Sequence, residues 1–217
     1  MGLLSRLFGG GGDHDRRGEG MADILAVLAQ SDPAWSPETI RRRLRDIFFA
    51  VQRSWIERDP AIGEPYMTES LSFRQGLRIE GLLRQNRVHQ LENPLIEDLD
   101  FVAYSDTSEP PRVTARLWIS LVETILDAET RRLVAGSRSQ RRDVQFWTLD
   151  LVDGEWLLAD VEEGTEGERH MAAPLVGEGF ANLSPEMILR ERYAREEITI
   201  EEFEAQMEQF LTEGPGY

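Results

Sequence analysis

Apolar residues in the first third of the chain recur at steps of three and four, which is the spacing of one face of an α-helix. Residues 35–59 carry this pattern most strongly, and the apolar positions there are Ile40, Leu44, Ile47, Phe48, Val51 and Trp55. Ser36 is a favourable N-cap residue, and Pro37 suits a first helical turn. An apolar face of this breadth needs a broad partner, so we expect the helix to pack on a curved sheet.

Shorter helices are predicted at residues 21–30 and 69–84. Beyond residue 95 the apolar period changes to two, which is typical of strands with one buried face. The clearest alternation runs from Val113 to Leu121, and further strands are expected at 143–151 and 155–161 around an Asp-Gly turn. Helices followed by consecutive antiparallel strands predict an α+β domain over residues 21–161.

The remaining segments differ in composition from this domain. Residues 1–20 are rich in glycine and charge and are expected to be flexible, and residues 162–182 are expected to form a linker. Residues 183–213 predict a small pair of helices, with a capping box between Thr199 and Glu202. So small a pair needs a surface to dock on, either within this chain, on a second copy or on a partner. The residues expected to mediate oligomerisation or docking are Tyr193, Ile198, Phe203, Met207 and Phe210.

The chain has 217 residues and a formal net charge of −16, and every one of its basic residues other than histidine is arginine. This charge argues against nucleic acid as a partner, because binding phosphates needs a basic surface. Cysteine is absent, which excludes disulfides and thiolate chemistry and is compatible with a cytoplasmic protein. No apolar run is long enough to span a bilayer. The run from Leu3 to Phe8 is either a peripheral membrane contact at the inner face of a membrane or a frayed terminus.

No constellation typical of catalysis stands out. The three histidines have no metal-ligand spacing, and no nucleotide-binding or nucleophile motif is present, so we expect no metal, no cofactor and no enzymatic activity. Glu123 continues the apolar register of its strand, so it either faces a pocket as a base with a raised pKa or turns to solvent at a bulge. Asp98 either faces the same pocket or faces water.

Two groups of side chains are candidate binding residues. Arginines gather around a predicted hairpin, either as an anion or partner patch or as an ordinary solvated surface; they are Arg131, Arg132, Arg138, Arg141 and Arg142. Apolar residues between the long helix and the sheet would line a ligand pocket for an acyl chain or an apolar peptide; they are Phe48, Val51, Trp55, Phe101, Leu117, Ile119 and Trp147.

Residues 32–161 resemble a known family. The segments DPAWS, IFFAVQRSWIERD and YMTESL, followed later by RLVAGS, FWTL and DGEWLLADV, are similar in order and spacing to the Tim-forty-four-like domain. That resemblance implies a nuclear-transport-factor-two-like fold, in which a long helix packs in a cone-shaped antiparallel sheet. Members of this family often work beside a membrane.

A second resemblance covers about residues 184–211. The segment LRERYAREEITIEEFE is similar to the SHOCT module, although Glu196 stands where that motif commonly has glycine. Such modules are associated with oligomerisation or tethering in bacterial proteins, so the combination implies a bacterial protein.

The leading functional hypothesis is a non-catalytic binding or scaffold protein. Its cone would hold an apolar ligand or partner segment, lipid or peptide, and its C-terminal helices would drive self-association or docking. One alternative is a membrane-peripheral adaptor in envelope biogenesis or protein translocation. Another is an isomerase, dehydratase or hydrolase of the same fold, with Glu123 or Asp98 as its base.

Overall fold

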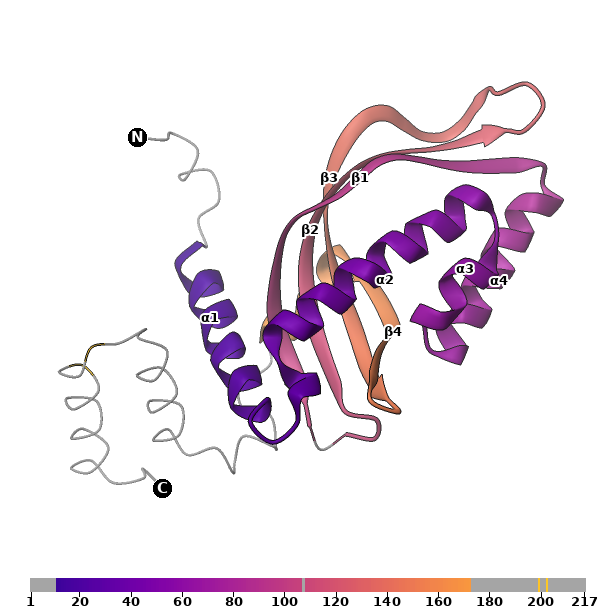
Figure 1. Ribbon diagram of the computed structural model, residues 1–217. Coiled ribbons are helices and arrows are strands. Elements are labelled where there is room, and N and C mark those ends of the chain that lie inside the picture. The colour runs from indigo at the N-terminus through magenta and orange to yellow at the C-terminus, as the bar shows by residue number, and fades with distance from the viewer. Residues whose placement is uncertain (1–10, 107, 173–198, 200–201, 203–217) are drawn as a thin grey trace. The chain divides into compact units, whose positions relative to one another are not determined.

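The computed structural model describes residues 11–106, 108–172, 199 and 202 (Figure 1). The chain divides into two compact units, of which one is Glu38–Ala173. Helix α1 (Gly11–Leu28) and the 3₁₀ turn η1 (Pro33–Trp35) belong to the other unit. Asp32 caps η1 by accepting a hydrogen bond from the backbone N–H of Ala34 at 2.9 Å.

Helix α1 begins earlier than the sequence predicted. Residues 11–20 were expected to be flexible, but they form the first half of α1. The physical reason is cooperativity, because once the apolar half of a helix has formed, each added residue gains a hydrogen bond without a new nucleation cost. Residues 1–10, including the run from Leu3 to Phe8, lie outside the described part of the chain.

Helix α2 (Pro37–Glu57) is the long amphipathic helix that the spacing predicted. Ile40, Leu44, Ile47 and Phe48 are fully buried. Phe48 packs against Trp147 of the sheet, with ring centroids 5.6 Å apart. A turn of helix α3 (Pro60–Gly63) and the 3₁₀ turn η2 (Glu64–Tyr66) lead into α4 (Glu69–Arg84), whose bounds agree with the predicted helix.

The sheet is a four-stranded antiparallel meander in the order β1-β2-β3-β4. Its strands are β1 (Arg87–Ser105), β2 (Arg112–Asp127), β3 (Leu133–Val152) and β4 (Glu155–Glu163). Asp153 and Gly154 join β3 to β4 with φ values of 50° and 81°, as a tight hairpin turn with two positive φ angles requires. The predicted α+β class, with helices on a curved antiparallel sheet, is therefore confirmed.

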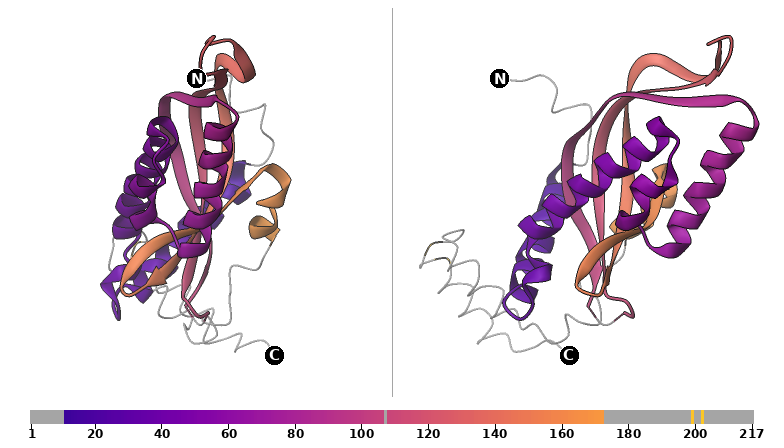
Figure 2. Two further views of the ribbon diagram at one scale, coloured as in Figure 1. Left: turned by 90° about the vertical axis from the view of Figure 1, so that its right-hand side faces the viewer. Right: turned by 45° about the vertical axis from the view of Figure 1, so that its right-hand side comes forward.

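The sheet bends sharply, and α2 lies across its concave face (Figures 1 and 2). Register shifts occur between Glu92 and Leu95 in the β1–β2 pairing and between Leu121 and Glu123 in the β2–β3 pairing. Bulges bend strands and increase their twist. These two bulges lie where the start of β1, the end of β2 and the start of β3 bend toward α2 and α4.

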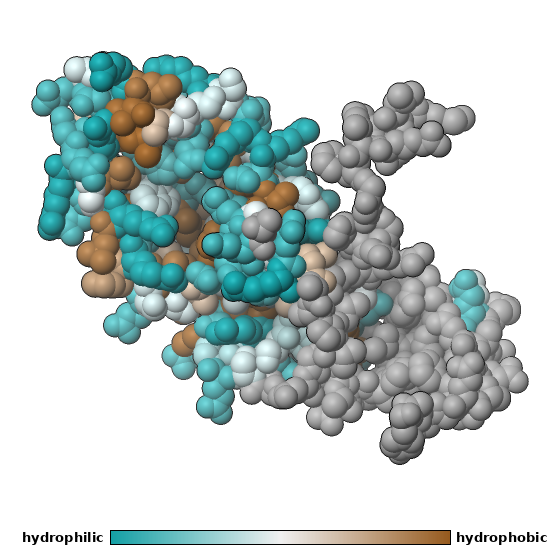
Figure 3. All heavy atoms as spheres, turned by 180° about the vertical axis from the view of Figure 1, so that it is seen from behind, coloured by the Kyte–Doolittle hydropathy of each residue, from teal (hydrophilic) through white to brown (hydrophobic). Residues whose placement is uncertain are grey.

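The concave face of β2 carries the predicted alternation. Val113, Ala115 and Leu117 are fully buried, whereas their neighbours in sequence point to the other face. Arg43 of α2 ties the helix to the sheet by donating from Nε to the backbone carbonyl of Trp156 at 2.9 Å. Leu77 of α4 is 53% exposed, so not every apolar residue of this helix is buried. Apolar side chains reach the surface among polar ones, as Figure 3 shows from behind.

The start of the predicted linker is ordered structure. Residues 162–172 complete β4 and form the turn η3 (Gly164–Glu166) and the short helix α5 (Arg169–Ala172). His170 stacks on Phe146 with ring centroids 6.1 Å apart and hydrogen-bonds Glu162 at 2.7 Å. These contacts join residues too far apart in sequence to be recognised from local composition. Residues 173–182 lie outside the described part.

The predicted capping box near the C-terminus is present. The backbone N–H of Thr199 donates to Glu202 Oε2 at 2.8 Å, and the N–H of Glu202 donates to Thr199 Oγ1 at 3.2 Å. The rest of the predicted helical pair, 183–213, is outside the described residues. The same holds for its expected docking residues Tyr193, Ile198, Phe203, Met207 and Phe210.

Candidate ligand-binding cavity

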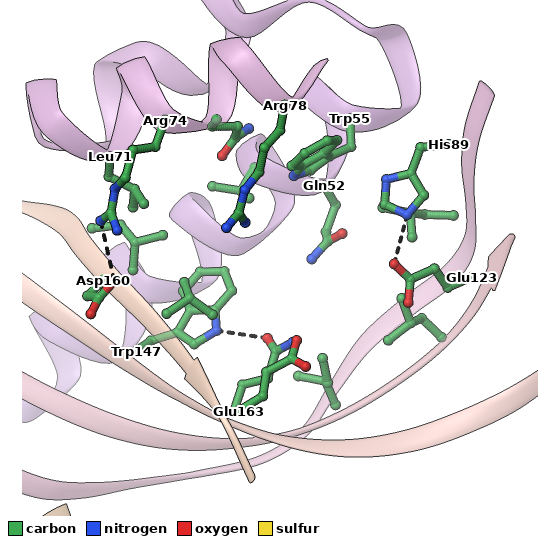
Figure 4. A pocket seen from close by; sticks show the side chains of 18 of the residues that line it. Gln52, Trp55, Leu71, Arg74, Arg78, His89, Glu123, Trp147, Asp160 and Glu163 are labelled. Carbon is green, nitrogen blue, oxygen red and sulfur yellow. Dashed lines mark hydrogen bonds and ion pairs between the residues drawn. The ribbon is translucent and has the colours of Figure 1, made fainter. Parts of the chain in front are cut away.

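A cavity of about 330 Å³ lies between the C-terminal half of α2, helix α4 and the concave face of the sheet (Figure 4). It sits beneath the bulged ends of the strands. Helix residues that line it are Val51, Gln52, Trp55, Leu71, Arg74, Gln75 and Arg78. Strand residues that line it are His89, Leu91, Ile119, Leu121, Glu123, Arg141, Gln145, Trp147, Leu158, Asp160, Val161 and Glu163. A depression on the other side of Trp55, Arg78 and His89 adjoins the cavity.

The inner wall of the cavity is apolar because alternate residues of the strands face it. Val51, Trp55, Ile119 and Trp147, which the sequence nominated as pocket residues, line this wall. The other three nominated residues, Phe48, Phe101 and Leu117, are buried in the core elsewhere and are not part of the cavity lining. The periodicity of apolar residues shows which face of the sheet a side chain lies on. It does not show whether a helix packs directly on that side chain or leaves a cavity beside it.

The outer wall is polar, which the sequence prediction of an apolar pocket missed. Arg74 and Arg78 reach into the cavity from successive turns of α4 (Figure 4). Arg74 forms an ion pair with Asp160 at 3.4 Å. Arg78 forms no ion pair with any residue that the structure describes. The cavity thus combines an apolar wall with a cation, Arg78, that pairs with no carboxylate in the described part of the chain.

Glu123 stands on the cavity wall and is held by two partners. His89 Nε2 lies 2.8 Å from Glu123 Oε1, and an Arg141 guanidinium nitrogen lies 2.5 Å from Oε2. The His89 hydrogen bond, aided by the charge of Arg141, lowers the pKa of Glu123 although partial burial opposes this shift. Trp55 meets the His89 ring edge-on, with centroids 5.2 Å apart.

One interpretation of Glu123 made it a base with a raised pKa. That prediction is wrong, because the carboxylate is stabilised in its charged form. The alternative, that Glu123 turns to solvent at a bulge, is also incomplete, since the side chain is 29% exposed and faces the cavity. Sequence reasoning missed His89 because it lies 34 residues from Glu123. Only the β1–β2 register, which pairs Leu91 with Glu123, brings the two together.

Asp98, the second candidate base, lies away from the cavity. It is exposed, and its side chain accepts a hydrogen bond from the backbone N–H of Leu99 at 2.8 Å. The register shift between Ile96 and Asp98 changes the face on which this residue lies. Of the two alternatives for Asp98, facing the pocket or facing water, the structure shows the second.

The five arginines of the predicted patch lie on the β2–β3 connection and on β3, and all are exposed. Arg131 donates to Gln90 at 3.0 Å, and Arg142 forms an ion pair with Glu97 at 3.0 Å. The side chains of Arg132 and Arg138 form no ion pair within the described structure. Arg141, which holds Glu123, is the member that also lines the cavity.

Among the described residues, no group of three or more acidic or histidine side chains is placed to hold a metal ion. Within the same residues, no helix has both the length and the apolar character needed to cross a bilayer.

One long helix laid across a bent antiparallel sheet, with a cavity left under the bend, defines a class of α+β domains. Residues 21–163, more than half of the chain, match the Tim44-like domain, and the protein belongs to this family. The family recognised from sequence motifs is therefore confirmed. The comparisons give no support for a SHOCT module, so that assignment stays a prediction.

No curated protein matches the sequence. Among solved structures, the chain is similar to the intermembrane space region of the chloroplast protein ARC6. The identity is 9% and the TM-score is 0.43, over 58% of this chain and 94% of that chain.

Proposed function

We propose that this protein is a non-catalytic binding or scaffold protein whose cavity holds a ligand with an apolar segment and an anionic group. The ligand is a lipid or a segment of a partner protein. The observation that carries the proposal is the juxtaposition of the apolar wall with Arg78, which lacks a carboxylate partner among the described residues.

The two walls make complementary contributions to binding. Burying an apolar chain against Trp55, Ile119 and Trp147 contributes roughly 25 cal/mol for each Å² removed from water. A carboxylate or phosphate at Arg78 would gain charge-assisted hydrogen bonds from a planar guanidinium. The buried contact between Gln75 and Ser54 holds α4, and with it Arg78, against α2.

Binding rather than catalysis is favoured by the state of the acidic residues. Glu123 lines the cavity and is hydrogen-bonded to His89, and its lowered pKa makes it a poor proton acceptor at neutral pH. Asp98, the other candidate base, is outside the cavity. Both residues named for the enzymatic alternative are thus unsuited to that role.

The proposal is tested by binding of dansyl-labelled undecanoic acid, whose emission reports transfer into an apolar site. Leu71→Trp, which fills the cavity, should abolish binding, and Arg78→Ala should weaken it by about tenfold because it removes a charged hydrogen-bond partner. Arg84→Ala is the matched control, since Arg84 is on the same helix but outside the cavity.

Equal binding by the native protein and Leu71→Trp would place the probe elsewhere and contradict the proposal. Native mass spectrometry of the purified full chain provides an independent measurement, in which a lipid or peptide should be retained by the native protein and lost from Leu71→Trp.

Membership in the Tim44-like family supports two further parts of this proposal, a protein partner and a peripheral contact with a membrane. We assign the membrane contact to residues 1–20 and self-association to residues 183–213. Flotation with liposomes, compared between the full chain and a variant lacking residues 1–20, tests the first. Sedimentation analysis of a variant ending at residue 182 tests the second.

A further inference from the structure

The N-terminal half of β3 is an open sheet edge. Strand β3 pairs with β2 over most of its length, but it pairs with β4 only from Gln145 to Val152. Residues 133–142 are all exposed, and no other strand of the described structure pairs with their outer side. Figure 1 shows this part of β3 running along the outside of the bend, away from β4. Apart from the N–H of Ser139, which donates to Ser137 Oγ at 3.1 Å, its outward backbone N–H and C=O groups are therefore available to another strand.

Features of this edge oppose the addition of a strand from a second copy. Residues 138–140 stand opposite the single residue Val122, which forms a bulge in the edge. An edge bulge interrupts the ladder of any added strand, whereas charged side chains disfavour only a strand that carries like charges.

The arginines along this edge of β3 indicate the charge of the strand that would bind to it. Arg132 and Arg138 have no ion-pair partner among the described residues, and Arg141 and Arg142 follow on the same strand. Two copies of this edge would place arginine near arginine, and like charges on neighbouring strands repel. Carboxylates on an incoming strand would instead meet the unpaired guanidinium groups.

We propose that the edge of β3 from residue 133 to residue 144 is a docking site for an extended acidic segment of a partner protein, which adds to the sheet as a further strand. Main-chain hydrogen bonds provide the affinity, as in other cases of strand addition, and the arginines select the acidic sequence. The site lies on the rim of the sheet and shares only Arg141 with the described lining of the cavity, so it goes beyond the function proposed above.

An extended peptide fits this surface better than an anionic membrane does. The protein as a whole carries a charge of −16, which repels a broad anionic bilayer more than a single peptide strand that contacts only the arginine-bearing edge. A bilayer also cannot satisfy a row of backbone donors and acceptors along a strand, whereas a peptide in the β conformation does so at each alternate residue.

The test uses the full chain and a fluorescein-labelled peptide of alternating glutamate and valine. Two control peptides separate the contributions: one has lysine in place of glutamate, and the other keeps the glutamates but replaces the valines by proline, which cannot donate to a ladder. Hydrogen exchange of the protein is measured with and without each peptide. The acidic valine peptide should bind and slow amide exchange specifically within residues 133–144, and both controls should fail.

Two pairs of substitutions test the arginines. Arg132→Glu with Arg138→Glu should weaken binding by at least about tenfold, because it replaces attraction with repulsion at the edge. Arg42→Glu with Arg45→Glu changes the net charge equally on the exposed face of α2 and should alter binding little. Circular dichroism confirms that both variants fold.

Several results would overturn the proposal. The first two are binding of the proline peptide as tight as that of the acidic valine peptide, and the same loss of affinity in both double variants. The other two are peptide binding without protection of residues 133–144 from exchange, and binding to phosphatidylglycerol vesicles but not to the acidic peptide. The Arg78→Ala variant, which tests the cavity, should leave this binding unchanged, so the two proposals fail independently.

Discussion

Helices α2 and α4 are joined by a buried polar contact that invites a precise test. Gln75 of α4 donates from Nε2 to Ser54 Oγ of α2 at 2.5 Å. Ser54 Oγ in turn donates to the backbone carbonyl of Val51 at 2.7 Å. Ser54 is fully buried and Gln75 is 7% exposed, so water does not readily replace either partner. The two side chains hold the helices that form one wall of the cavity.

Removing the two partners should have unequal effects. Ser54→Ala leaves a buried amide donor of Gln75 without an acceptor, which costs about 1–3 kcal/mol of unfolding free energy. Gln75→Met has nearly the same length, and it leaves the Ser54 hydroxyl bonded to Val51, so we expect a loss below about 1 kcal/mol. The double variant should be close to Gln75→Met alone, because no unsatisfied donor remains.

Urea unfolding followed by circular dichroism measures these differences, with the midpoint shifting and the slope unchanged. The double-mutant cycle should give a coupling of about 1–2 kcal/mol between the two positions. In a chain of this size, 1 kcal/mol corresponds to a change in Tm of about 2–4 °C, which calorimetry resolves.

Additive effects of the two substitutions would refute the reasoning, as would a larger loss from Gln75→Met than from Ser54→Ala. The first result would mean that the hydrogen bond contributes no coupling free energy between Ser54 and Gln75. The second would mean that the packing of the glutamine side chain, rather than its amide, holds α4.

Three further predictions concern charge and packing. Glu123→Gln should destabilise the protein at pH 7, and the difference from the native protein should shrink as pH falls below about 4.5, because a carboxylate with a lowered folded pKa stabilises only while ionised. Gly167→Ala should cost about 1–3 kcal/mol in urea unfolding, since its methyl group would overlap the buried Phe146 ring. Phe48→Ala should cost about 3–5 kcal/mol by the same assay, since Phe48 is fully buried.

Each of these three predictions has either a control variant or a contrary outcome. A stability difference for Glu123→Gln that stays constant down to pH 3 or so would contradict the stated linkage. For Gly167→Ala the control is Gly81→Ala, where nothing lies within 4 Å and the added methyl should stabilise α4 by about 0.5–1 kcal/mol. A loss of less than about 1 kcal/mol in Phe48→Ala would mean that α2 does not depend on its apolar face.

The candidate site was only partly predictable from the sequence. Val51, Trp55, Ile119 and Trp147 were found because amphipathic periods identify the faces that meet between a helix and a sheet. The polar wall was not found, because Arg74 and Arg78 occupy the polar face of α4, which a sequence pattern assigns to water. Where a helix lines a cavity, part of its polar face points into the cavity instead of into water.

The sequence by itself determined the elements and their order. The three- and four-residue spacing that produced α2, the alternation that buried one face of β2 and the Asp153-Gly154 turn are all local, since each depends on residues within a few positions of one another. The hydrophobic effect acts on such periods directly, so helix, strand and hairpin follow without knowledge of their partners.

Only the tertiary structure decided what surrounds each side chain. The bulges near Leu121 bend the sheet over α2, and this bend creates the cavity, while the β1–β2 register brings His89 to Glu123. The shortness of β4 leaves half of β3 as an edge. Both outcomes depend on register and on contacts between distant segments, whose energies are a sum over many weak interactions that no local pattern encodes.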